Sequence, residues 1–87
     1  MSNIPKRGKV LVMFKNSWCQ PCKVLLSIIE NNPPSLPLME IDIDENSELA
    51  TKYNVKGVPT LIVVENDEEI KRYVGLLTAA QLMEFGK

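Results

Sequence analysis

The amino-acid sequence predicts an α/β fold with a four-stranded mixed sheet and helices on both of its faces. Strand-like and helix-like segments alternate along the chain, a helix joins the first two strands, and a tight turn joins the last two. A helical crossover makes the strands that it connects parallel, whereas a tight turn makes them antiparallel. The predicted element order is therefore βαβ, a short helix, and then ββα.

The first half of the chain contains the βαβ unit. Residues 9–15 form a nearly continuous apolar run rich in β-branched residues, which is typical of a strand covered on both faces. From about residue 21 to residue 31, apolar residues recur three and four positions apart, which predicts a helix. Pro33 and Pro34 end this helix because proline cannot continue one. Residues 36–43 are predicted to form a second buried strand.

The second half contains a short helix that begins near residue 47, followed by the ββα unit. The last two strands are expected at residues 60–64 and 69–74. Asn66 lies in the turn between them and can adopt a positive φ angle. Thr78 starts a capping-box pattern that predicts the onset of a final helix, which ends at Gly86.

Length and composition restrict the classes of function. The 87 residues suit one domain spanning residues 1–87, and 45% hydrophobic with 24% charged residues is ordinary globular composition. A net charge of −1 gives no basic excess for nucleic-acid binding. No apolar run approaches the roughly 18 residues of a membrane span, and residues 1–8 lack the apolar core of a signal peptide. We therefore expect a cytoplasmic monomer that binds neither nucleic acid nor membrane.

Histidine is absent, which excludes Ser–His, Cys–His and histidine–metal chemistry together. Cysteine occurs twice, at Cys19 and Cys22, where the first strand is followed by the first helix. Residues three apart in the first helical turn are neighbours, so the two sulfurs can form a disulfide with little backbone movement. The helix N-terminus favours the thiolate of Cys19, and Cys22, one turn further on, is expected to be less exposed. This arrangement suits dithiol exchange, with Cys19 as nucleophile and Cys22 as resolving thiol.

Three other interpretations of the pair are less favoured. A structural disulfide is uncommon in the cytosol, and closing so short a loop gains little entropy. A zinc site needs four ligands, and the sequence has no further cysteine or histidine to supply them. Two buried cysteines without a function would not need a place at a helix terminus. We therefore expect thiol–disulfide chemistry without a metal or an organic cofactor.

These residues resemble the thioredoxin family from about residue 10 to residue 85. The segment Trp18–Lys23 (WCQPCK) is similar to the active-site motif of that family. The segment Gly57–Thr60 (GVPT) resembles its second signature, in which the proline follows a cis peptide bond and faces the cysteines. Gly75 matches a glycine at the rim of the same groove. The resemblance implies a target-binding groove formed by Trp18, Gln20, Pro21, Val58, Pro59 and Gly75.

The sequence also departs from the family pattern. By comparison with the family pattern, we expect the opening strand and helix of full-length members to be missing, which makes the size closer to that of glutaredoxins. Gln20 replaces the usual glycine of the motif, Met13 stands where members have a buried aspartate, and Glu40 stands at the position of the neighbouring lysine. Met13 and Glu40 are expected on one face of the sheet. A buried Glu40 could then accept the proton of Cys22, the alternative being a solvated Glu40 with water as the proton acceptor.

The sequence therefore predicts a small protein-disulfide reductase of the thioredoxin type. The resemblance implies regeneration by thioredoxin reductase and ribonucleotide reductase as a client. Two alternatives remain open. A glutathione-coupled, glutaredoxin-like reductase is favoured by the size and by Lys15 shortly before the motif, but disfavoured by Trp18 and by the lack of a glutathione-binding Gly-Gly segment. The other is a non-enzymatic binding subunit with the same fold.

Overall fold

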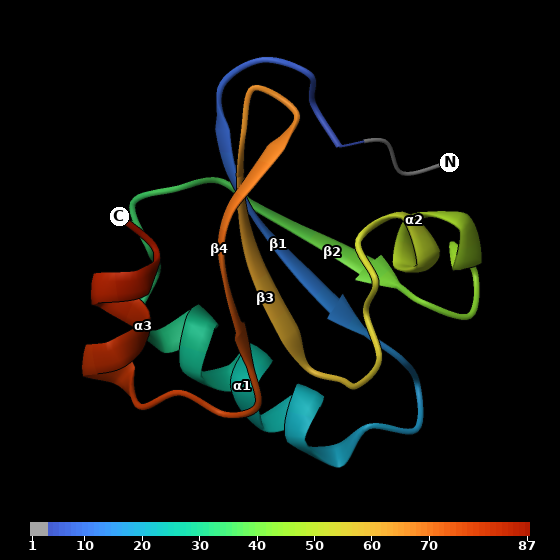
Figure 1. Ribbon diagram of the computed structural model, residues 1–87. Coiled ribbons are helices and arrows are strands. Elements are labelled where there is room, and N and C mark those ends of the chain that lie inside the picture. Colours follow the sequence, from blue (N-terminus) through green and yellow to red (C-terminus); the bar gives the residue numbers. More distant parts are fainter. Residues whose placement is uncertain (1–3) are drawn as a thin grey trace.

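The described residues, 4–87, form a four-stranded mixed sheet with helices on both faces (Figure 1). The structure is a computed structural model, and residues 1–3 of the predicted domain lie outside its described part. The elements in chain order are β1 (Lys9–Lys15), α1 (Gln20–Asn31), β2 (Leu38–Asp42), α2 (Ser47–Lys52), β3 (Thr60–Glu65), β4 (Glu68–Val74) and α3 (Ala79–Phe85). The predicted fold class and element order are confirmed.

Strand β1 lies inside the sheet, whose strand order is β2-β1-β3-β4. It pairs in parallel with β2 and antiparallel with β3, so that Met13 lies beside Glu40 on one side and Leu61 on the other. Strands β3 and β4 form the antiparallel hairpin that the turn chemistry predicted. Asn66 in the hairpin turn has a φ angle of 51°, the left-handed conformation expected of it.

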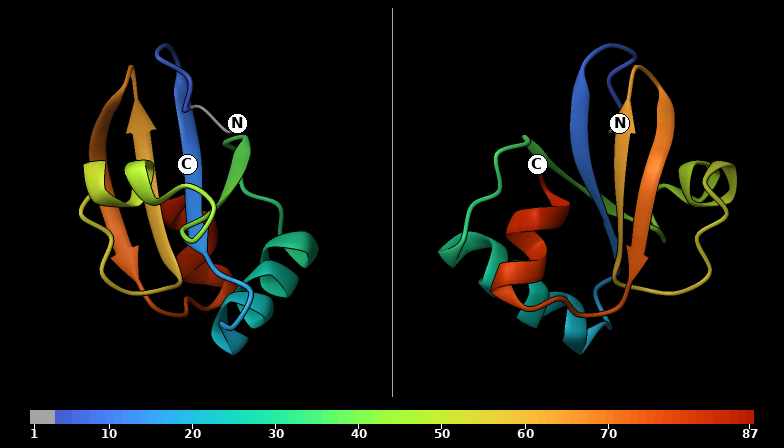
Figure 2. Two further views of the ribbon diagram at one scale, coloured as in Figure 1. Left: turned by 90° about the vertical axis from the view of Figure 1, so that its right-hand side faces the viewer. Right: turned by 60° about the vertical axis from the view of Figure 1, so that its left-hand side comes forward.

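Two apolar clusters cover the two faces of the sheet. Helices α1 and α3 lie on one face, and α2 lies on the other (Figure 2), where Ile4 also packs. The first cluster, which we call the α1 face, contains Leu11, Met13, Cys19, Cys22, Leu25, Ile29, Leu61, Val63, Leu77 and Leu82. The second, the α2 face, contains Ile4, Val10, Val12, Phe14, Ile41, Tyr53, Ile62 and Val64. Alternate residues of β1 therefore belong to different clusters, as the pleat of a strand requires.

Strand β2 is shorter than the sequence predicted. It runs from Leu38 to Asp42, whereas residues 36–43 were expected to be extended. Pro37 has no N–H to donate, and its carbonyl accepts the hydrogen bond of the Leu11 N–H at 2.9 Å. The ladder with β1 therefore starts at a carbonyl, and the regular strand begins one residue later.

Side-chain hydrogen bonds cap the start of α3. At the start of α3, the Thr78 hydroxyl accepts from the Gln81 N–H at 3.1 Å, and the Gln81 side chain accepts from the Thr78 N–H at 2.9 Å. This reciprocal capping box satisfies two backbone donors that the helix leaves free.

None of the helices within residues 4–87 is long and apolar enough to cross a membrane.

The capping box at Thr78 gives a first prediction. We expect Thr78→Ala to lower the free energy of unfolding by about 1 kcal/mol, because the N-terminal amides of α3 lose their acceptor. Urea denaturation followed by circular dichroism measures the change. Thr51→Ala, at an exposed threonine of α2, is the control and is expected to be nearly neutral. Equal effects of the two substitutions would contradict a specific role for the cap.

Candidate active site

Cys19 and Cys22 form a disulfide at the start of α1. The sulfur–sulfur distance is 2.18 Å and the Cα–Cα distance is 5.2 Å. Cys19 is the N-cap residue, with extended backbone at φ −88° and ψ 102°, and its sulfur accepts a hydrogen bond from the Cys22 N–H at 3.1 Å. An N-cap side chain accepts a hydrogen bond from a free amide of the first turn, and here the acceptor is a sulfur. The same amide would stabilise negative charge on Cys19 in the reduced protein.

The two sulfurs differ in their access to solvent. Cys22 is 1% exposed, and Cys19 is 8% exposed. Both belong to the cluster of the α1 face, so apolar side chains lie beneath them. The lower exposure of Cys22 agrees with the sequence expectation. Of the two, Cys19 is the residue that an incoming disulfide reaches more easily.

Trp18, Gln20 and Pro21 flank Cys19 in the sequence. All three are exposed, and Trp18 is 86% open to solvent. The loop before the helix is shaped by Asn16, whose side-chain oxygen accepts from the Trp18 N–H at 3.0 Å. A large exposed aromatic ring on the residue before the reactive cysteine offers contact area to another protein.

Val58 and Pro59 lie between α2 and β3, on the segment that reaches the same end of the sheet as the start of α1 (Figure 1). The peptide bond between them is cis, as the resemblance implied. Pro59 is buried, and Val58 packs against the cluster that contains both cysteines. The Gly75 N–H, just after β4, donates to the Pro59 carbonyl at 2.9 Å. Gly75 has a φ angle of 109°, a conformation that side-chain-bearing residues rarely adopt.

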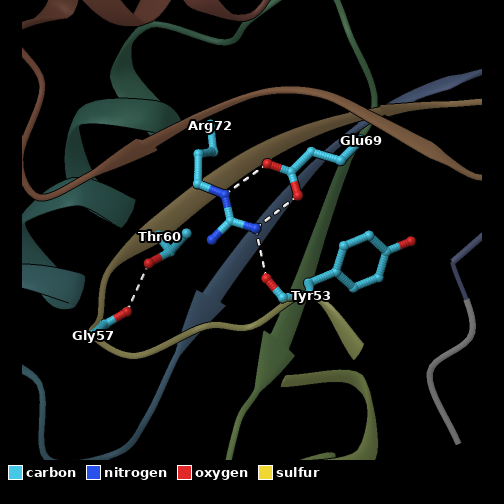
Figure 3. A network of polar contacts seen from close by, with 5 residues as sticks. All are labelled: Tyr53, Gly57, Thr60, Glu69 and Arg72. Carbon is cyan, nitrogen blue, oxygen red and sulfur yellow. Dashed lines mark hydrogen bonds and ion pairs between the residues drawn. The ribbon is translucent and has the colours of Figure 1, made fainter. Parts of the chain in front are cut away.

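A polar network holds the segment that carries Val58 and Pro59 (Figure 3). The Arg72 guanidinium donates from Nη2 to the Tyr53 carbonyl at 2.5 Å and makes two 2.6 Å hydrogen bonds to the Glu69 carboxylate. The Thr60 hydroxyl, on a residue that is 1% exposed, donates to the Gly57 carbonyl at 2.6 Å. The hydrogen bond and charge of Arg72 lower the pKa of Glu69, and Glu69 in turn raises the pKa of Arg72.

Glu40, the candidate proton acceptor, is partly exposed and forms an ion pair. It shares the sheet face of Met13, as expected from the register, and of the two alternatives left by the sequence the structure shows the partly solvated side chain. Its side chain is 42% exposed, and Oε1 lies 2.8 Å from the Lys15 ammonium. The physical reason is its place on β2, an edge strand of the sheet, where a long side chain reaches solvent and an oppositely charged neighbour.

Sequence reasoning missed several residues at this end of the molecule. Val74 and Leu76, on either side of Gly75, are 60% and 45% exposed and add apolar surface beside the groove residues. Their apolar side chains next to a glycine were a readable signal. Arg72 and Tyr53 were missed for another reason: their contact joins positions 19 residues apart, and no local pattern shows it.

The site is a disulfide-forming cysteine pair at a helix N-terminus, with Cys22 almost fully buried, in an α/β fold with a mixed sheet. This arrangement defines the class of thiol–disulfide oxidoreductases. A sequence model of the family described as Thioredoxin matches residues 1–87. The chain therefore belongs to the thioredoxin family.

Relatives and solved structures agree with this assignment. A thioredoxin of Chlamydia pneumoniae is 46% identical over 72 residues, covering 79% of this chain and 71% of the relative. A thioredoxin of Bacillus subtilis is 37% identical, covering 88% of this chain and 78% of the relative. Among solved structures, a single-site mutant of a thioredoxin from Halobacterium salinarum superposes with a TM-score of 0.82 at 34% identity, covering 92% of this chain and 73% of that one.

The Glu69 carboxylate gives a prediction of pH dependence. Because its pKa in the folded protein is below the ordinary value of 4.5, its ionised form stabilises the fold. This contribution is complete above the ordinary pKa of 4.5 and is lost as the pH falls through the lower folded pKa. We expect Glu69→Gln to destabilise the protein at about pH 7 and to have a much smaller effect at about pH 3. Urea titrations at both pH values measure it. A destabilisation independent of pH would contradict the ionic contribution of Glu69.

Proposed function

We propose that this protein reduces disulfide bonds in target proteins by dithiol exchange through its Cys-Gln-Pro-Cys motif. The observation that carries the proposal is the pairing of the less buried N-cap residue, Cys19, with the almost fully buried Cys22 one helical turn away. A reductase needs one sulfur that meets the target and one that the target does not reach, so that the mixed disulfide resolves internally.

The reaction proceeds in two exchanges that conserve electrons. In the reduced protein, the Cys19 thiolate attacks one target sulfur, forming a mixed disulfide and releasing the other target sulfur as a thiolate that takes up a proton. The Cys22 thiol then loses its proton and attacks the Cys19 sulfur. The target leaves with both sulfurs reduced, and the protein is left with the Cys19–Cys22 disulfide, having given up two electrons.

A target chain is proposed to bind in extended form beside Val58 and Pro59. Among residues 4–87, no hydrogen bond uses the N–H or the carbonyl of Val58, so both are available to an extended chain. Pro59 has no N–H, and its carbonyl already accepts from Gly75. The exposed side chain of Trp18 forms the proposed apolar rim on the side of the cysteines.

Thioredoxin reductase is the proposed source of electrons, and ribonucleotide reductase is a proposed client. Both proposals rest on membership of the thioredoxin family, as does a cytoplasmic place of action. Insulin reduction with NADPH and thioredoxin reductase is the direct test, run beside a second assay with glutathione and glutathione reductase. Activity in the second assay alone would replace the proposal with a glutathione-coupled reductase. Activity in neither assay would favour a binding subunit.

The two cysteines have separate predicted roles. Cys19→Ser should lower the rate of insulin reduction to the uncatalysed background, since the attacking nucleophile is gone. Cys22→Ser should instead accumulate a mixed disulfide between Cys19 and the target, visible on a non-reducing gel and by mass spectrometry. Trapping by the Cys19→Ser variant and not by Cys22→Ser would reverse the assignment of nucleophile and resolving thiol.

Glu40 remains the one carboxylate proposed to accept the proton of Cys22, through a water. Met13, 0% exposed and in the same cluster as the cysteines, places an apolar side chain beneath the pair that cannot accept a proton. The exposure of Glu40 and its ion pair with Lys15 favour the alternative, in which solvent water alone takes the proton.

Two substitutions distinguish these routes. If Glu40 takes part, Glu40→Gln should slow target reduction and change the dependence of its rate on pH, because the carboxylate base is lost. Met13→Asp supplies a carboxylate beneath the pair and serves as the comparison. The measurement is the rate of insulin reduction across the pH range. An unchanged rate and profile for Glu40→Gln would remove Glu40 from the mechanism, and no change in either variant would leave water as the acceptor.

A further inference from the structure

Helix α2 is short and only partly buried, and it contacts the α2-face cluster mainly through Leu49 and its C-cap residue, Tyr53. It is six residues long, from Ser47 to Lys52, and none of these residues is buried. Its N-cap residue, Asn46, makes no side-chain hydrogen bond to the helix. Isolated helices of this length are unstable in water, so their position depends on contacts with the rest of the protein. Here the chain continues from α2 directly to the Val58–Pro59 segment.

Arg72 supplies such a contact at the C-terminal end of α2. Tyr53 is the C-cap residue of the helix, and its carbonyl accepts from Arg72 Nη2. A helix C-terminus carries free carbonyls and a partial negative charge, both of which a guanidinium satisfies. Arg72 lies on β4 opposite Ile62, a member of the α2-face cluster, so its side chain is directed to that face.

Glu69 fixes the orientation of the Arg72 guanidinium. Its two carboxylate oxygens each lie 2.6 Å from a different nitrogen, Nε and Nη2, and the same Nη2 also donates to Tyr53 (Figure 3). A two-point contact of this kind holds the plane of a guanidinium, which a single contact does not. The Arg72 and Glu69 side chains are 31% and 30% exposed, so the pair is only partly screened by solvent.

The segment from Tyr53 to Pro59 is thus held at three carbonyls by groups from β3, β4 and the residue after β4. The Tyr53 carbonyl accepts from Arg72, the Gly57 carbonyl accepts from Thr60, and the Pro59 carbonyl accepts from Gly75. Val58 lies between two of these points with its own N–H and carbonyl free within residues 4–87. The hydrogen bonds leave open the peptide groups that a target strand would use.

We propose that Arg72, oriented by Glu69, is a positioning residue that holds the end of α2 and thereby fixes the Val58–Pro59 segment for target binding. The inference rests on the proposed function, because it assigns Arg72 to the capture of the target and not to the sulfur chemistry. Arg72 touches neither cysteine in the network described, and it acts through the Tyr53 carbonyl. Its loss should therefore weaken the binding of protein targets and leave the reactivity of the dithiol intact.

The test compares Arg72→Ala with the wild type in insulin reduction, with thioredoxin reductase held in excess. We expect the KM for insulin to rise about tenfold with little change in kcat. The reason is that the lost contact positions the target equally in the ground state and in the transition state. Reduction of a small aromatic disulfide, which has no chain to align on Val58, should change little. Relative to the wild type, amide hydrogen exchange in Arg72→Ala should accelerate more in residues 54–58 than in β1.

Matched variants separate positioning from a general loss of stability. Lys71→Ala removes the same charge from the neighbouring position of β4, where the side chain faces the Phe85 ring, and should keep the wild-type KM. Arg72→Lys should restore part of the affinity, since an ammonium donates to the Tyr53 carbonyl but cannot bond both Glu69 oxygens in one plane. If Arg72→Ala does not fold, Glu69→Gln, which leaves the Arg72–Tyr53 contact in place, should raise the KM by a smaller factor.

Other results would overturn the inference. An unchanged KM in both Arg72→Ala and Glu69→Gln would show that the network does not position the groove. An equal loss of activity toward insulin and the small disulfide would assign Arg72 to overall stability. A wild-type protein inactive toward insulin with either reductant would instead refute the proposed function. A normal wild type with an unaffected Arg72→Ala variant refutes only the inference about Arg72.

Discussion

Hydrogen bonding of β1 on both of its edges is the constraint on which the rest of the structure depends. The strand pairs with β2 and β3 at once, and its side chains supply both apolar clusters. A strand buried in this way has little freedom to shift its register, because a shift by one residue would exchange the two faces. It ends at Lys15, four positions before Cys19. The place of the reactive sulfur is therefore fixed by a strand that is hydrogen-bonded on both edges.

The active site combines parts of unequal rigidity. The cysteines rest on α1 and on the cluster beneath it, which includes fully buried residues such as Leu25. The facing segment around Val58 follows the short helix α2 and depends on polar contacts from β3 and β4. Apolar packing thus places the sulfurs, whereas the backbone proposed to meet the target is held by apolar contacts of Val58 together with hydrogen bonds and one ion pair. These two kinds of interaction respond differently to pH and salt.

Local patterns predicted most of the fold, and contacts distant in sequence account for what they missed. The apolar run of β1, the cysteine spacing and the Thr78 cap each act within a few residues, and each was readable. The sequence left open whether Glu40 is buried or solvated, because the pattern of β2 does not show that this strand lies at the edge of the sheet. The contact between Arg72 and Tyr53 depends on where β4 passes α2, which periodicity does not report.

The ion pair between Lys15 and Glu40 has a consequence for assembly. Strand β2 is an outer strand of the sheet within residues 4–87, and its free edge is a surface on which another strand could add. Glu40 is its central residue. Antiparallel pairing of two copies about this centre would place two Glu40 carboxylates opposite each other, an arrangement that like charges disfavour. A charged residue in the middle of an edge strand is one of the features by which natural sheets avoid edge-to-edge pairing.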